Sequence, residues 1–557
     1  MFLSTAITVS SWSLVWRIGC TNGRCQRTDL LELGYNLQEK QKGMRKMKKF
    51  GQMFLVGLAM VFGLGLVTGN VQPPAASAAG TEYYVATSGS DSNAGTSDAP
   101  WKTLQHAADV VPAGSTVYVR GGVYKQKVKI TRSGSASQGP IVFTNYGTET
   151  AIIDGSGLSV SGNEGLIELA DVNYVTVQGF EIRNFTTASK NVVPVGIYVH
   201  GSGGFINLSN NKIHDIKNTV TPTGKNRLGR DAHGIAVYGT KAPASIHDLT
   251  ISGNELYNLV LGSSESLVLN GNVDGFAVTD NLIHDNDNIG IDLIGFESTA
   301  PNTTYDQARN GLVKGNRVYN NSVQNNPSYK SDDNSAGGIY VDGGKDSIIE
   351  QNYSYNNDIG VEIASEHAGK ATSNITVRSN VIYNNRLTGI AMGGYNEERG
   401  STVNCKIVNN TLYKNDTFED GSGQFLVQYD TRNNVIQNNI FVASSTDMLI
   451  SNGYTKNSGN VVDYNLYFAP SGSSEANWIW KNKEYTGFSA YKSGTGNDTH
   501  SLFADPKFVS AANSDFHLQS SSPAIDAGNT DLAIIGTLDI DGKPRVQGVA
   551  VNIGAYE

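Results

Sequence analysis

Three carboxylates occupy matching places in a repeated, strand-like pattern. The segments "GIDLIG", "GIYVDG" and "GVEIAS" carry Asp292, Asp342 and Glu362. Apolar residues alternate with these acids at period two, which points the apolar side chains inward and the acids outward. Strands stacked at about 4.8 Å would place Asp292 and Glu362 roughly 9–10 Å apart, with Tyr340 between them, and Asp342 about 8 Å from Glu362. These separations leave room for a water molecule or a metal ion.

Two kinds of chemistry suit such a set of acids. Carboxylate oxygens are the ligands that Ca²⁺ prefers, and the predicted calcium ligands are Asp292, Asp342, Glu362 and Glu366, with Glu297 as a further candidate. Alternatively, one carboxyl group protonates a leaving oxygen while another activates water. The expected separations exceed the roughly 5 Å of retaining glycosidases and match the ~6.5–9.5 Å of inverting ones.

Proton transfer beside these acids has its own candidates. Lys370, Arg399 and Tyr340 are predicted bases, and His367 in "SEHAGK" is the predicted proton-transfer histidine. A lone outward acid or a surface histidine is ordinarily just a solvated side chain. The hypothesis of a site therefore depends on three acids falling on consecutive strands.

Aromatic, amide and basic side chains accompany the acids and could hold a sugar chain. Aromatic rings stack on the CH faces of sugars, and arginines grip carboxylates with two hydrogen bonds. Stacking between neighbouring repeats and pairing with local aspartates are the alternative interpretations. The predicted substrate-binding residues are Tyr198, His200, Arg230, Tyr238, Asn270, Tyr395 and Arg399.

The elements that must position these residues form an internal repeat. Units such as "LSNNKIHDI", "VTDNLIHDN" and "VRSNVIYNN" each place an Asn before a short apolar strand. The Asn positions are 27 to 43 residues apart, the length of a coil of three short strands. Asn suits a coil corner because it tolerates the left-handed conformation and its amide can bond to the next coil. The repeated Asn residues are Asn211, Asn254, Asn281, Asn316, Asn352, Asn380, Asn410 and Asn439.

This pattern predicts an all-β chain folded as a parallel β-helix, a single solenoid with three strands per coil. Residues Trp101 to Val111 form an amphipathic pattern that predicts a helix capping the N-terminal end. His214 and His284 share a repeat position with several tyrosines, which indicates packing rather than chemistry. The three longest coils carry their extra residues beside the same line of strands, the line that includes the acid-bearing ones. Such loops would wall a groove and hold a binding site.

The N-terminal part predicts export. Residues 44–78 have a basic start, an apolar stretch and the small-residue end Ala76-Ser77-Ala78, which is typical of a signal peptide; a membrane anchor is the alternative. We expect residues 1–43 to precede the true start at Met44 or Met47. The β-helix domain is expected over 79–557, with an N-terminal cap and first coils over 79–190, central coils with the groove over 191–445, and C-terminal coils and a cap over 446–557.

Charge and cysteine content restrict the partners. Residues 1–78 hold 9 of the 42 basic and 3 of the 51 acidic side chains, so the remainder carries a net charge of −15. Such a chain disfavours nucleic acid and anionic membranes, and an anionic polysaccharide would need a bridging cation. Of the 3 cysteines only Cys405 follows residue 78, so the exported protein should have no internal disulfide. We expect an extracellular monomer.

Segments at both ends of the domain resemble a known family. The segment "TEYYVATSGSDSNAGTSDAPWKTLQHAADVVPAGSTVYVRGGVYKQKV" resembles the amino-terminal part of family 9 pectate lyases. The segments "FADPKFVSAANSDFHLQSSSPAIDAG" and "DIDGKPRVQGVAVNIGAYE" resemble the closing part of related β-helix proteins. With the repeats, the resemblance covers most of residues 80–557. It implies a secreted, right-handed parallel β-helix protein of the pectate-lyase type.

The resemblance also implies a reaction. Such proteins cleave acidic polysaccharides by β-elimination, with calcium held by acidic residues and a lysine or arginine as base. The chain has neither the paired aspartates of family 9, nor the arginine motif of family 1, nor the aspartate motifs of polygalacturonases, so no catalytic residue carries over. The expected function is a calcium-dependent lyase of a uronic-acid-containing polysaccharide. An inverting glycoside hydrolase and a non-catalytic, glycan-binding surface protein are the alternatives.

Overall fold

The computed structural model describes residues 80–222, 227–330 and 333–557. The predicted start at Met44 or Met47 and the predicted signal peptide lie outside these residues. Within them, no helix is both long enough and apolar enough to cross a lipid bilayer. The predicted divisions at residues 190 and 445 stay predictions.

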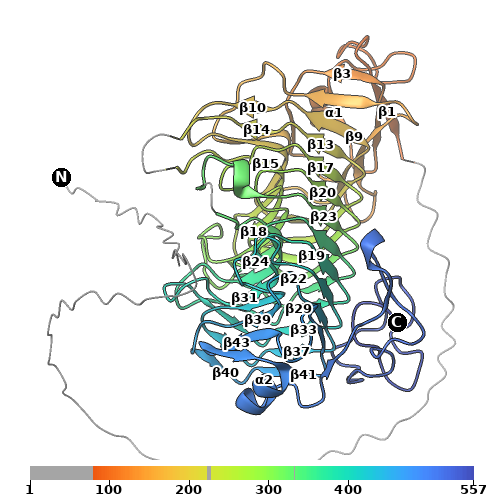
Figure 1. The fold of residues 1–557 in the computed structure, drawn as a ribbon. Helices are drawn as coiled ribbons and strands as arrows, with labels where there is room; N and C mark the ends of the chain where they lie inside the picture. The colour runs from red at the N-terminus through yellow and green to blue at the C-terminus, as the bar shows by residue number, and fades with distance from the viewer. Residues whose placement is uncertain (1–79, 223–226, 331–332) are drawn as a thin grey trace, which may run out of the picture. The chain divides into compact units, whose positions relative to one another are not determined.

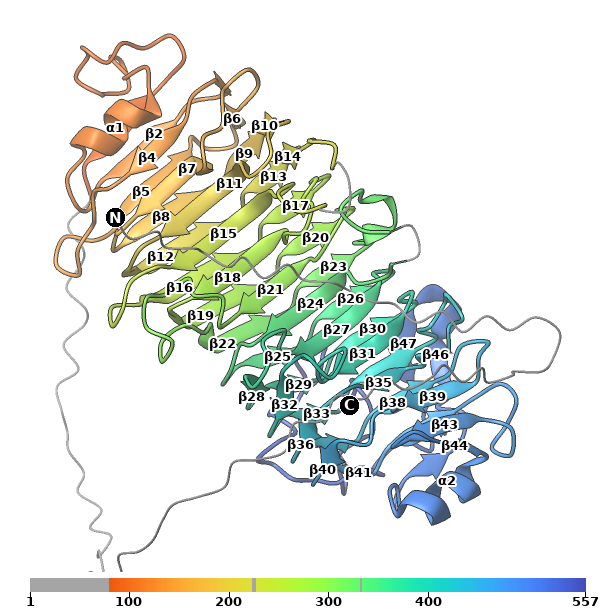
Figure 2. The same ribbon diagram turned by 90° about the vertical axis from the view of Figure 1, so that its left-hand side faces the viewer.

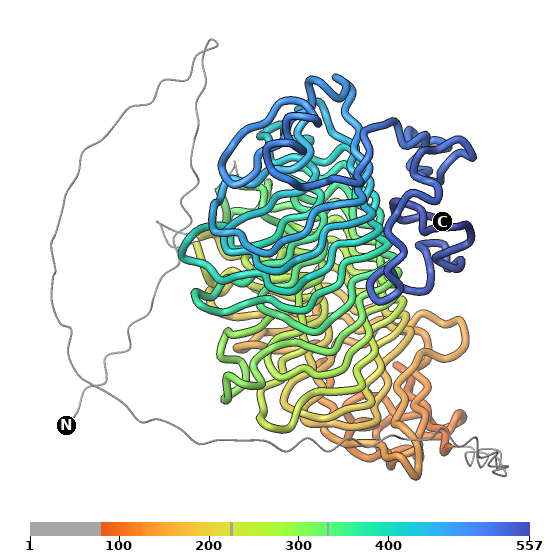
Figure 3. Tube along the Cα trace, turned by 90° about the horizontal axis from the view of Figure 1, so that it is seen from below, coloured from red at the N-terminus to blue at the C-terminus, as the bar shows by residue number. Residues whose placement is uncertain are grey.

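The described chain winds into successive coils, each built from three short strands (Figures 1 and 3). Every strand of a coil pairs in parallel with its counterpart in the next coil, so the strands form three sheets of 13 strands each. Only the last strand of one of these sheets, β44, pairs antiparallel. The predicted β-helix with three strands per coil is confirmed.

Each sheet runs the length of the stack. The first sheet comprises β1 (Glu82–Val85), β2 (Thr116–Val119), β5 (Ile141–Asn145), β8 (Val175–Gln178), β12 (Gly203–Ser209), β16 (Ile246–Ser252), β19 (Val273–Thr279), β22 (Arg309–Lys314), β25 (Ile348–Glu350), β29 (Thr376–Arg378), β33 (Lys406–Val408), β37 (Val435–Gln437) and β41 (Val461–Asp463).

The site sheet carries the predicted site residues and faces the viewer in Figure 2. It comprises β4 (Val128–Ile130), β7 (Asn163–Ala170), β11 (Val193–His200), β15 (His233–Gly239), β18 (Leu267–Gly271), β21 (Ile291–Ile294), β24 (Gly337–Asp342), β27 (Ile359–Ala364), β31 (Thr388–Met392), β35 (Phe425–Val427), β39 (Met448–Ser451), β43 (Asn477–Trp480) and β44 (Lys483–Thr486).

The ladder sheet carries a column of stacked rings. It comprises β3 (Gly122–Tyr124), β6 (Ala151–Asp154), β9 (Phe180–Arg183), β13 (Lys212–His214), β17 (Glu255–Tyr257), β20 (Leu282–His284), β23 (Arg317–Tyr319), β26 (Tyr353–Tyr355), β30 (Val381–Tyr383), β34 (Thr411–Tyr413), β38 (Ile440–Val442), β42 (Leu466–Phe468) and β45 (Leu502–Phe503).

Smaller elements complete the fold. They are the parallel pair β10 (Thr186–Thr187) and β14 (Lys217–Asn218), the four-stranded sheet of β28 (Ala371–Ser373), β32 (Ser401–Val403), β36 (Thr431–Arg432) and β40 (Asn457–Ser458), the antiparallel pair β46 (Phe508–Ser510) and β47 (Asp515–Leu518), the helices α1 (Leu104–Val110) and α2 (Phe488–Thr495), and the 3-10 helices η1 (Val323–Asn325) and η2 (Ala511–Asn513).

The interior of the coils is a continuous apolar core. Alternate residues such as Ile291 and Leu293 of β21 are fully buried and belong to one cluster that extends from Val85 to Tyr491. Each fully buried aliphatic side chain of this kind contributes about 1.5–3 kcal/mol. A coil cannot bury its apolar face alone, so stacking of neighbouring coils stabilises the fold.

An unbroken asparagine ladder runs through one corner. The backbone N–H and the side-chain amide of each repeated Asn donate to Oδ1 of the Asn in the next coil, as from Asn281 to Asn316 at 2.9 and 3.0 Å. All eight predicted residues take part, from Asn211 to Asn439. The prediction that Asn occupies the corner because it tolerates the left-handed conformation is wrong. The left-handed backbone falls on the residue before each ladder Asn, such as Asp280 (φ 57°) before Asn281, so the ladder Asn itself serves through its amide.

The predicted N-terminal helix is present but starts later than Trp101. Helix α1 begins after Thr103, whose hydroxyl accepts the His106 N–H at 3.1 Å. Trp101 instead bridges to Val85 of β1, so its backbone already belongs to the strand layer. The helix packs Leu104 and two alanines against the first strands.

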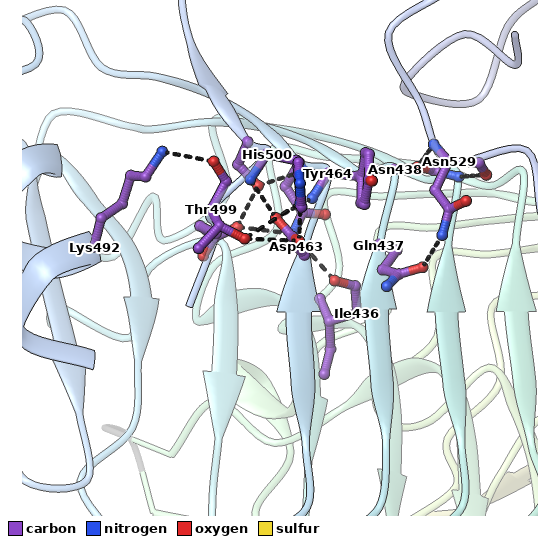
Figure 4. Close-up of polar contacts among 12 residues, drawn as sticks. Ile436, Gln437, Asn438, Asp463, Tyr464, Lys492, Thr499, His500 and Asn529 are labelled. Carbon is purple, nitrogen blue, oxygen red and sulfur yellow. Dashed lines mark hydrogen bonds and ion pairs between the residues drawn. The ribbon is translucent and has the colours of Figure 1, made fainter. Parts of the chain in front are cut away.

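The last coil is tied to the loop that follows it by Asp463, at the end of β41 (Figure 4). Its carboxylate accepts the backbone N–H of His500 at 2.7 Å, lies 2.7 Å from Nδ1 of the same residue and accepts the Thr499 hydroxyl at 3.2 Å. Burial opposes ionisation of Asp463, but the hydrogen bonds from His500 outweigh it and lower the pKa. The His500 ring stacks on Tyr464 with centroids 4.6 Å apart.

The C-terminal segment, residues 505–557, runs back along the outside of the stack (Figures 1 and 3). Asn529 and Asn438 exchange two hydrogen bonds at 2.8 and 3.0 Å, as Figure 4 shows. Further back, the hydroxyl of Tyr556 lies 3.2 Å from that of Tyr353 on β26. The segment therefore covers part of the ladder sheet rather than only the end of the stack.

Candidate functional site

The outward residues that the sequence predicts to be aligned occupy paired positions on neighbouring strands of the site sheet, the sheet that faces the viewer in Figure 2. Asp292 of β21 pairs with Tyr340 of β24, and Tyr340 pairs with Glu362 of β27. Period two within strands and a constant register between coils put these side chains on one line. The whole column reads Tyr198, Ala236, Val268, Asp292, Tyr340, Glu362 and Ala391.

The three predicted acids are covered rather than open to solvent. Asp292, Asp342 and Glu362 keep only 2%, 5% and 7% of their accessible surface. The expectation of solvent-facing acids in an open groove is therefore wrong for these side chains. The insertion before β24 contacts preceding coils, where the Tyr329 hydroxyl accepts the Asn288 amide at 3.1 Å and the Asn326 amide donates to the Gly262 carbonyl. Covered carboxyl groups hold their protons more tightly than solvated ones.

Six carboxyl groups gather around these strands, and each of the buried ones senses the charge of at least one other. Burial and mutual repulsion both disfavour ionisation of the buried members. We call the set the acid cluster. Its members are Glu265, Asp292, Glu297, Asp342, Glu362 and Glu366.

Asp342 lies at the end of β24, and the loop that follows the next strand, β27, holds its side chain. Its Oδ1 accepts the backbone N–H of Glu366 at 2.7 Å. Burial, followed by the charges of Glu366 and Asp292, raises its pKa well above the usual range, although that hydrogen bond acts in the opposite direction. A carboxyl group that is fixed by a hydrogen bond but repelled by neighbouring acids is suited to hold a cation or a proton.

Asp292 has an oxygen without a partner. Its Oδ1 is inaccessible and forms no hydrogen bond within residues 80–222, 227–330 and 333–557. Burial and then the charge of Glu265 raise its pKa well above the usual range. An unpaired buried carboxylate oxygen costs about 1–3 kcal/mol or more, so this atom indicates a place for a ligand.

Glu362 is the clearest proton donor of the cluster. Burial, with a smaller contribution from the charge of Glu366, raises its pKa from 4.5 to about 8. At neutral pH its carboxyl group therefore carries a proton. Acids with pKa values near the working pH are the usual general acids of enzymes.

Sequence reasoning missed Glu265 as a member of the site. Glu265 is 8% exposed, and burial followed by the charge of Glu297 raises its pKa well above the usual range. His233, its neighbour in the preceding coil, lies with Nδ1 3.0 Å from the Glu265 carbonyl and Nε2 3.1 Å from the Tyr238 hydroxyl. Burial lowers the pKa of His233 to about 4, so this imidazole is neutral.

The reason for the omission is local. Glu265 and His233 stand two residues before the inward Leu267 and Ile235, so strict alternation would point them into the coil. However, the N–H groups of Gly234 and Ile235 both donate to the Ser266 carbonyl, which interrupts the regular pairing. Strict alternation therefore could not place Glu265, two residues before β18, among the outward acids, although His233 at the start of β15 could be recognised beside the groove.

Glu297, Asp342 and His367 form a compact group of side chains that could hold a metal ion. One ligand atom of each lies within 4.8 Å of the others. The Asn270 amide donates to Glu297 at 2.9 Å, while Asn270 Oδ1 is buried and has no partner in the described chain. Glu297 is exposed, so this edge of the acid cluster is the one open to solvent. The predicted ligand set of Asp292, Asp342, Glu362 and Glu366 stays a prediction.

The predicted basic residues lie after the strand ends. Arg399 donates to the Glu366 carbonyl at 3.2 Å, lies over the Tyr395 ring at 4.4 Å, and its charge favours ionisation of Glu366. Lys370 is exposed, with Nζ 5.2 Å from the Phe296 ring. Both are placed at the same open edge as Glu297. Buried His367 Nε2 has no hydrogen-bond partner among the described residues.

Three of the predicted binding residues upstream contact one another, and Arg230 has partners of its own. Tyr198 stacks on His200 at 4.7 Å and meets Tyr238 edge-on at 5.7 Å, so these ring faces already contact one another. His200 lies 2.9 Å from Glu168. Arg230 donates to the Val220 carbonyl at 2.7 Å, and burial lowers its pKa. Tyr238 also bonds with His233 and senses the charges of Glu265 and Glu297, so these rings lie beside the upstream part of the acid cluster.

Comparison with known proteins places this architecture in a family. Residues 83–281 match the "Pel9A-like, right handed beta helix region" model, and residues 195–414 match the "Right handed beta helix region" model. The uncharacterized protein YwoF of Bacillus subtilis (strain 168) is 44% identical over 446 residues, which is 80% of this chain and 92% of that protein. The chain belongs to the Pel9A-like right-handed β-helix family.

Two further likenesses are narrower. Pectate lyase PEL9 of Emericella nidulans is 34% identical over 162 residues, which is 28% of this chain and 38% of that protein. The crystal structure of XylC with xylose covers 85% of this chain and 98% of its own, with a TM-score of 0.51 and 13% identity. The latter likeness concerns the fold alone.

The Pel9A-like match stops short of most of the acid cluster. The matched region ends at residue 281, so it includes Glu265 but not Asp292 or the acids that follow. Family membership therefore explains the fold and the N-terminal coils. The chemistry of the cluster must be argued from its own residues.

Proposed function

We propose that this Pel9A-like protein is an extracellular, polysaccharide-cleaving enzyme whose active site is the acid cluster. The finer proposal is a calcium-dependent lyase that cleaves a uronic-acid-containing chain by β-elimination. One observation carries the proposal. Several buried carboxyl groups with raised pKa values are crowded together, and one edge of the group is open and flanked by basic side chains. Such an arrangement is costly to stability and typical of functional sites.

The residues present fit a hard divalent cation. The unpaired Asp292 Oδ1 and Asn270 Oδ1 are oxygen ligands without partners in the described chain, and Glu297 and Asp342 add carboxylates. Oxygen ligands of this number and charge suit Ca²⁺. His367 offers a nitrogen in the same group, which a softer metal would prefer. A bound cation would neutralise the substrate carboxylate and so make the neighbouring C–H more acidic.

The chain's own residues supply the proton transfers of an elimination. The base removes the proton from the carbon next to the sugar carboxylate, the bond from the neighbouring carbon to the glycosidic oxygen breaks, and a carbon–carbon double bond forms. His367, with its unpartnered Nε2, and Lys370 at the open edge are the proposed bases. Glu362, protonated at neutral pH, donates its proton to the leaving oxygen. Arg399 is placed to bind a substrate carboxylate.

An inverting glycoside hydrolase is the second candidate, and the raised pKa of Glu362 favours it equally. In that reaction Glu362 protonates the leaving oxygen, while Asp342 or Glu366 removes a proton from the attacking water; because burial raises the pKa of both, the base must first lose its own proton. The two reactions differ in their products. Elimination leaves an unsaturated sugar end, and hydrolysis adds one water molecule across the cleaved bond.

A panel of substrates separates these reactions. The purified protein is incubated with polygalacturonate, alginate, a glycosaminoglycan and a neutral glucan, each with calcium or with a chelator. New ultraviolet absorbance from an unsaturated product that is lost with chelator supports the lyase. New reducing ends without that absorbance support the hydrolase instead. Glycan binding without any product by the wild-type protein would support the non-catalytic alternative and contradict both enzymes.

Matched variants locate the reaction. Glu362→Gln and Asp342→Asn should each lower turnover by about 10²–10⁴-fold, as the loss of a general acid or base does. Glu255→Gln is the control, because Glu255 lies on the ladder sheet and pairs with Lys212 at 3.3 Å. Full activity of both acid-cluster variants would rule this cluster out as the active site.

Export and oligomeric state are part of the proposal. We infer that residues 44–78 direct secretion and that the mature protein acts as a monomer. N-terminal sequencing of protein recovered from the medium tests the first inference, and a start near Ala79 is expected. Light scattering of the same sample tests the second.

A further inference from the structure

The first sheet has one position, at or near the start of its strands, where the backbone is left-handed in many successive coils. In two neighbouring coils the residue at this position is aromatic: Tyr174 (φ 55°) and Phe205 (φ 58°). The corresponding residues of the later coils are all of the kinds that adopt this conformation readily. They are Asp248, Gly275, Asn310, Asp346, Asn374, Asn404, Asn433 and Gly459.

Phe205 is an unfavourable choice for this position. A left-handed backbone brings Cβ too close to the following carbonyl oxygen, which Asn and Asp offset by local hydrogen bonds and Phe cannot. Phe205 is also 44% exposed, so burial of its ring does little to offset the strain. Strained residues tend to occur where they serve binding or catalysis. Phe205 is therefore a candidate for a binding role on the surface of the first sheet.

Neighbouring rings hold the Phe205 side chain in place. Phe205 stacks face to face on Tyr174, with centroids 4.4 Å apart and planes 7° apart. The His247 ring lies perpendicular to the Phe205 ring at 5.6 Å, and the Asp248 carboxylate lies 2.8 Å from His247 Nδ1. These contacts fix the Phe205 ring while a large part of it stays exposed. A fixed, exposed ring is a surface on which another flat group can stack.

A shallow groove of about 470 Å³ begins at Phe205 and spans the strands β12, β16 and β19. Asn207 and Thr250, which pair in register, line it with an amide and a hydroxyl, and the exposed Asp248 lies at its rim. A Cβ added at Gly275 would meet no atom closer than 3.8 Å, so the far end of the groove is open. This groove is therefore accessible from solvent, in contrast to the covered acid cluster.

The residues that line the groove favour a neutral sugar. None of them is Lys or Arg within the described chain, so a sugar carboxylate would face Asp248 without a cation to hold it. Sugar hydroxyls, by contrast, can donate to the Asp248 carboxylate and bond with Thr250. The Oδ1 of Asn207 has no hydrogen-bond partner among the described residues, so no protein group fixes the orientation of this amide and it is available to a ligand.

We propose that this groove, which we call the Phe205 groove, binds one sugar ring of a neutral polysaccharide. The CH face of the sugar lies against the Phe205 ring. Its hydroxyls bond with Asn207, Thr250 and Asp248. The Phe205 groove is on the first sheet and the acid cluster is on the site sheet, so the groove anchors the protein on a neutral glycan and takes no part in cleavage.

Calorimetric titration with cellopentaose, xylopentaose and mannopentaose tests the proposal, and the wild-type protein should bind at least one of them. Phe205→Asn introduces a residue type found at this position in later coils, so the variant should fold, while its affinity should fall about five- to tenfold. Thr250→Val removes one hydroxyl at nearly constant shape and should weaken binding about two- to tenfold. The matched control is Phe418→Asn, because Phe418 is 48% exposed in the loop between β34 and β35; its affinity should equal that of wild type.

The outcomes separate the Phe205 groove from the proposed catalytic function. Failure of the wild-type protein to bind any of the three neutral sugars, or wild-type affinity in both Phe205→Asn and Thr250→Val, would overturn the proposal. Trigalacturonate with calcium should bind wild type and Phe205→Asn equally, and weaker binding by the variant would overturn the assignment of a neutral sugar. Neutral sugar binding without any binding or cleavage of uronates would support the Phe205 groove and contradict the proposed catalytic function.

Discussion

Replacement of Glu362 by glutamine should make the protein more stable than wild type, by an amount that grows as pH rises. Glutamine mimics the protonated carboxyl group, which is the form that the buried site prefers. Because burial raises the pKa of Glu362 from 4.5 to about 8, the folded state binds its proton more tightly than the unfolded state. The stabilising effect of that proton is complete below the unfolded pKa and is lost as pH rises through the folded pKa.

The magnitude follows from the two pKa values. At roughly 1.4 kcal/mol per pKa unit, ionisation of Glu362 should cost the wild-type protein ~3–4 kcal/mol between about pH 5 and about pH 8. The variant has no carboxyl group at this position and escapes that cost. The two proteins should therefore have similar free energies of unfolding at about pH 5, and Glu362→Gln should be the more stable by ~3–4 kcal/mol at about pH 8.

Urea unfolding of both proteins over this pH range, followed by circular dichroism, measures the difference. Glu168→Gln is a control of opposite sign. Burial opposes ionisation of Glu168, but its contacts with Lys129 and His200 outweigh that and lower the pKa. Its stabilising effect is therefore present above its usual pKa, so this variant should lose stability at about pH 8. A pH-independent difference between wild type and Glu362→Gln would refute the assignment of a buried, protonated Glu362.

Three shorter predictions concern the ladder, the cation and the thiol. Asn316→Ala should lower the free energy of unfolding by about 2–4 kcal/mol, because it leaves the buried Asn281 N–H unpaired. A loss below ~0.5 kcal/mol, which is what we expect for the exposed control Asn302→Ala, would contradict this prediction. Calcium should raise the unfolding midpoint of the wild-type protein at about pH 8, and Asp292→Asn should reduce that rise; an equal rise in both proteins would exclude Asp292 as a ligand. Burial raises the pKa of Cys405 to about 12, so mass spectrometry should find its peptide alkylated only after unfolding, and native labelling would contradict that burial.

The repeat explains why so much of the fold was predictable from the sequence. The period of two within strands and the recurring Asn specify the coil, its inward face and the pairing of equivalent residues in neighbouring coils. The alignment of Asp292, Tyr340 and Glu362 therefore needed no tertiary information. The Asn ladder was predictable for the same reason, since its amides bond between equivalent positions.

The features that escaped prediction depend on contacts between distant segments. The near-complete burial of Glu362, which raises its pKa, depends on tertiary packing that the sequence pattern does not specify. Glu265 was missed because the pairing at Ser266 departs from regular alternation. The return of the C-terminal segment along the ladder sheet has no periodic pattern in the sequence, so its contact with this sheet could not be predicted.

The central claim is that the acid cluster cleaves a uronic-acid-containing chain by elimination. Mass spectrometry of polygalacturonate digested in the presence of calcium tests it most directly. We predict oligosaccharides that are lighter by one water molecule than hydrolysis products, formed by the wild-type protein and by Glu255→Gln but not by Asp342→Asn. Products that contain the added water, or unsaturated products formed equally well by Asp342→Asn, would contradict the claim.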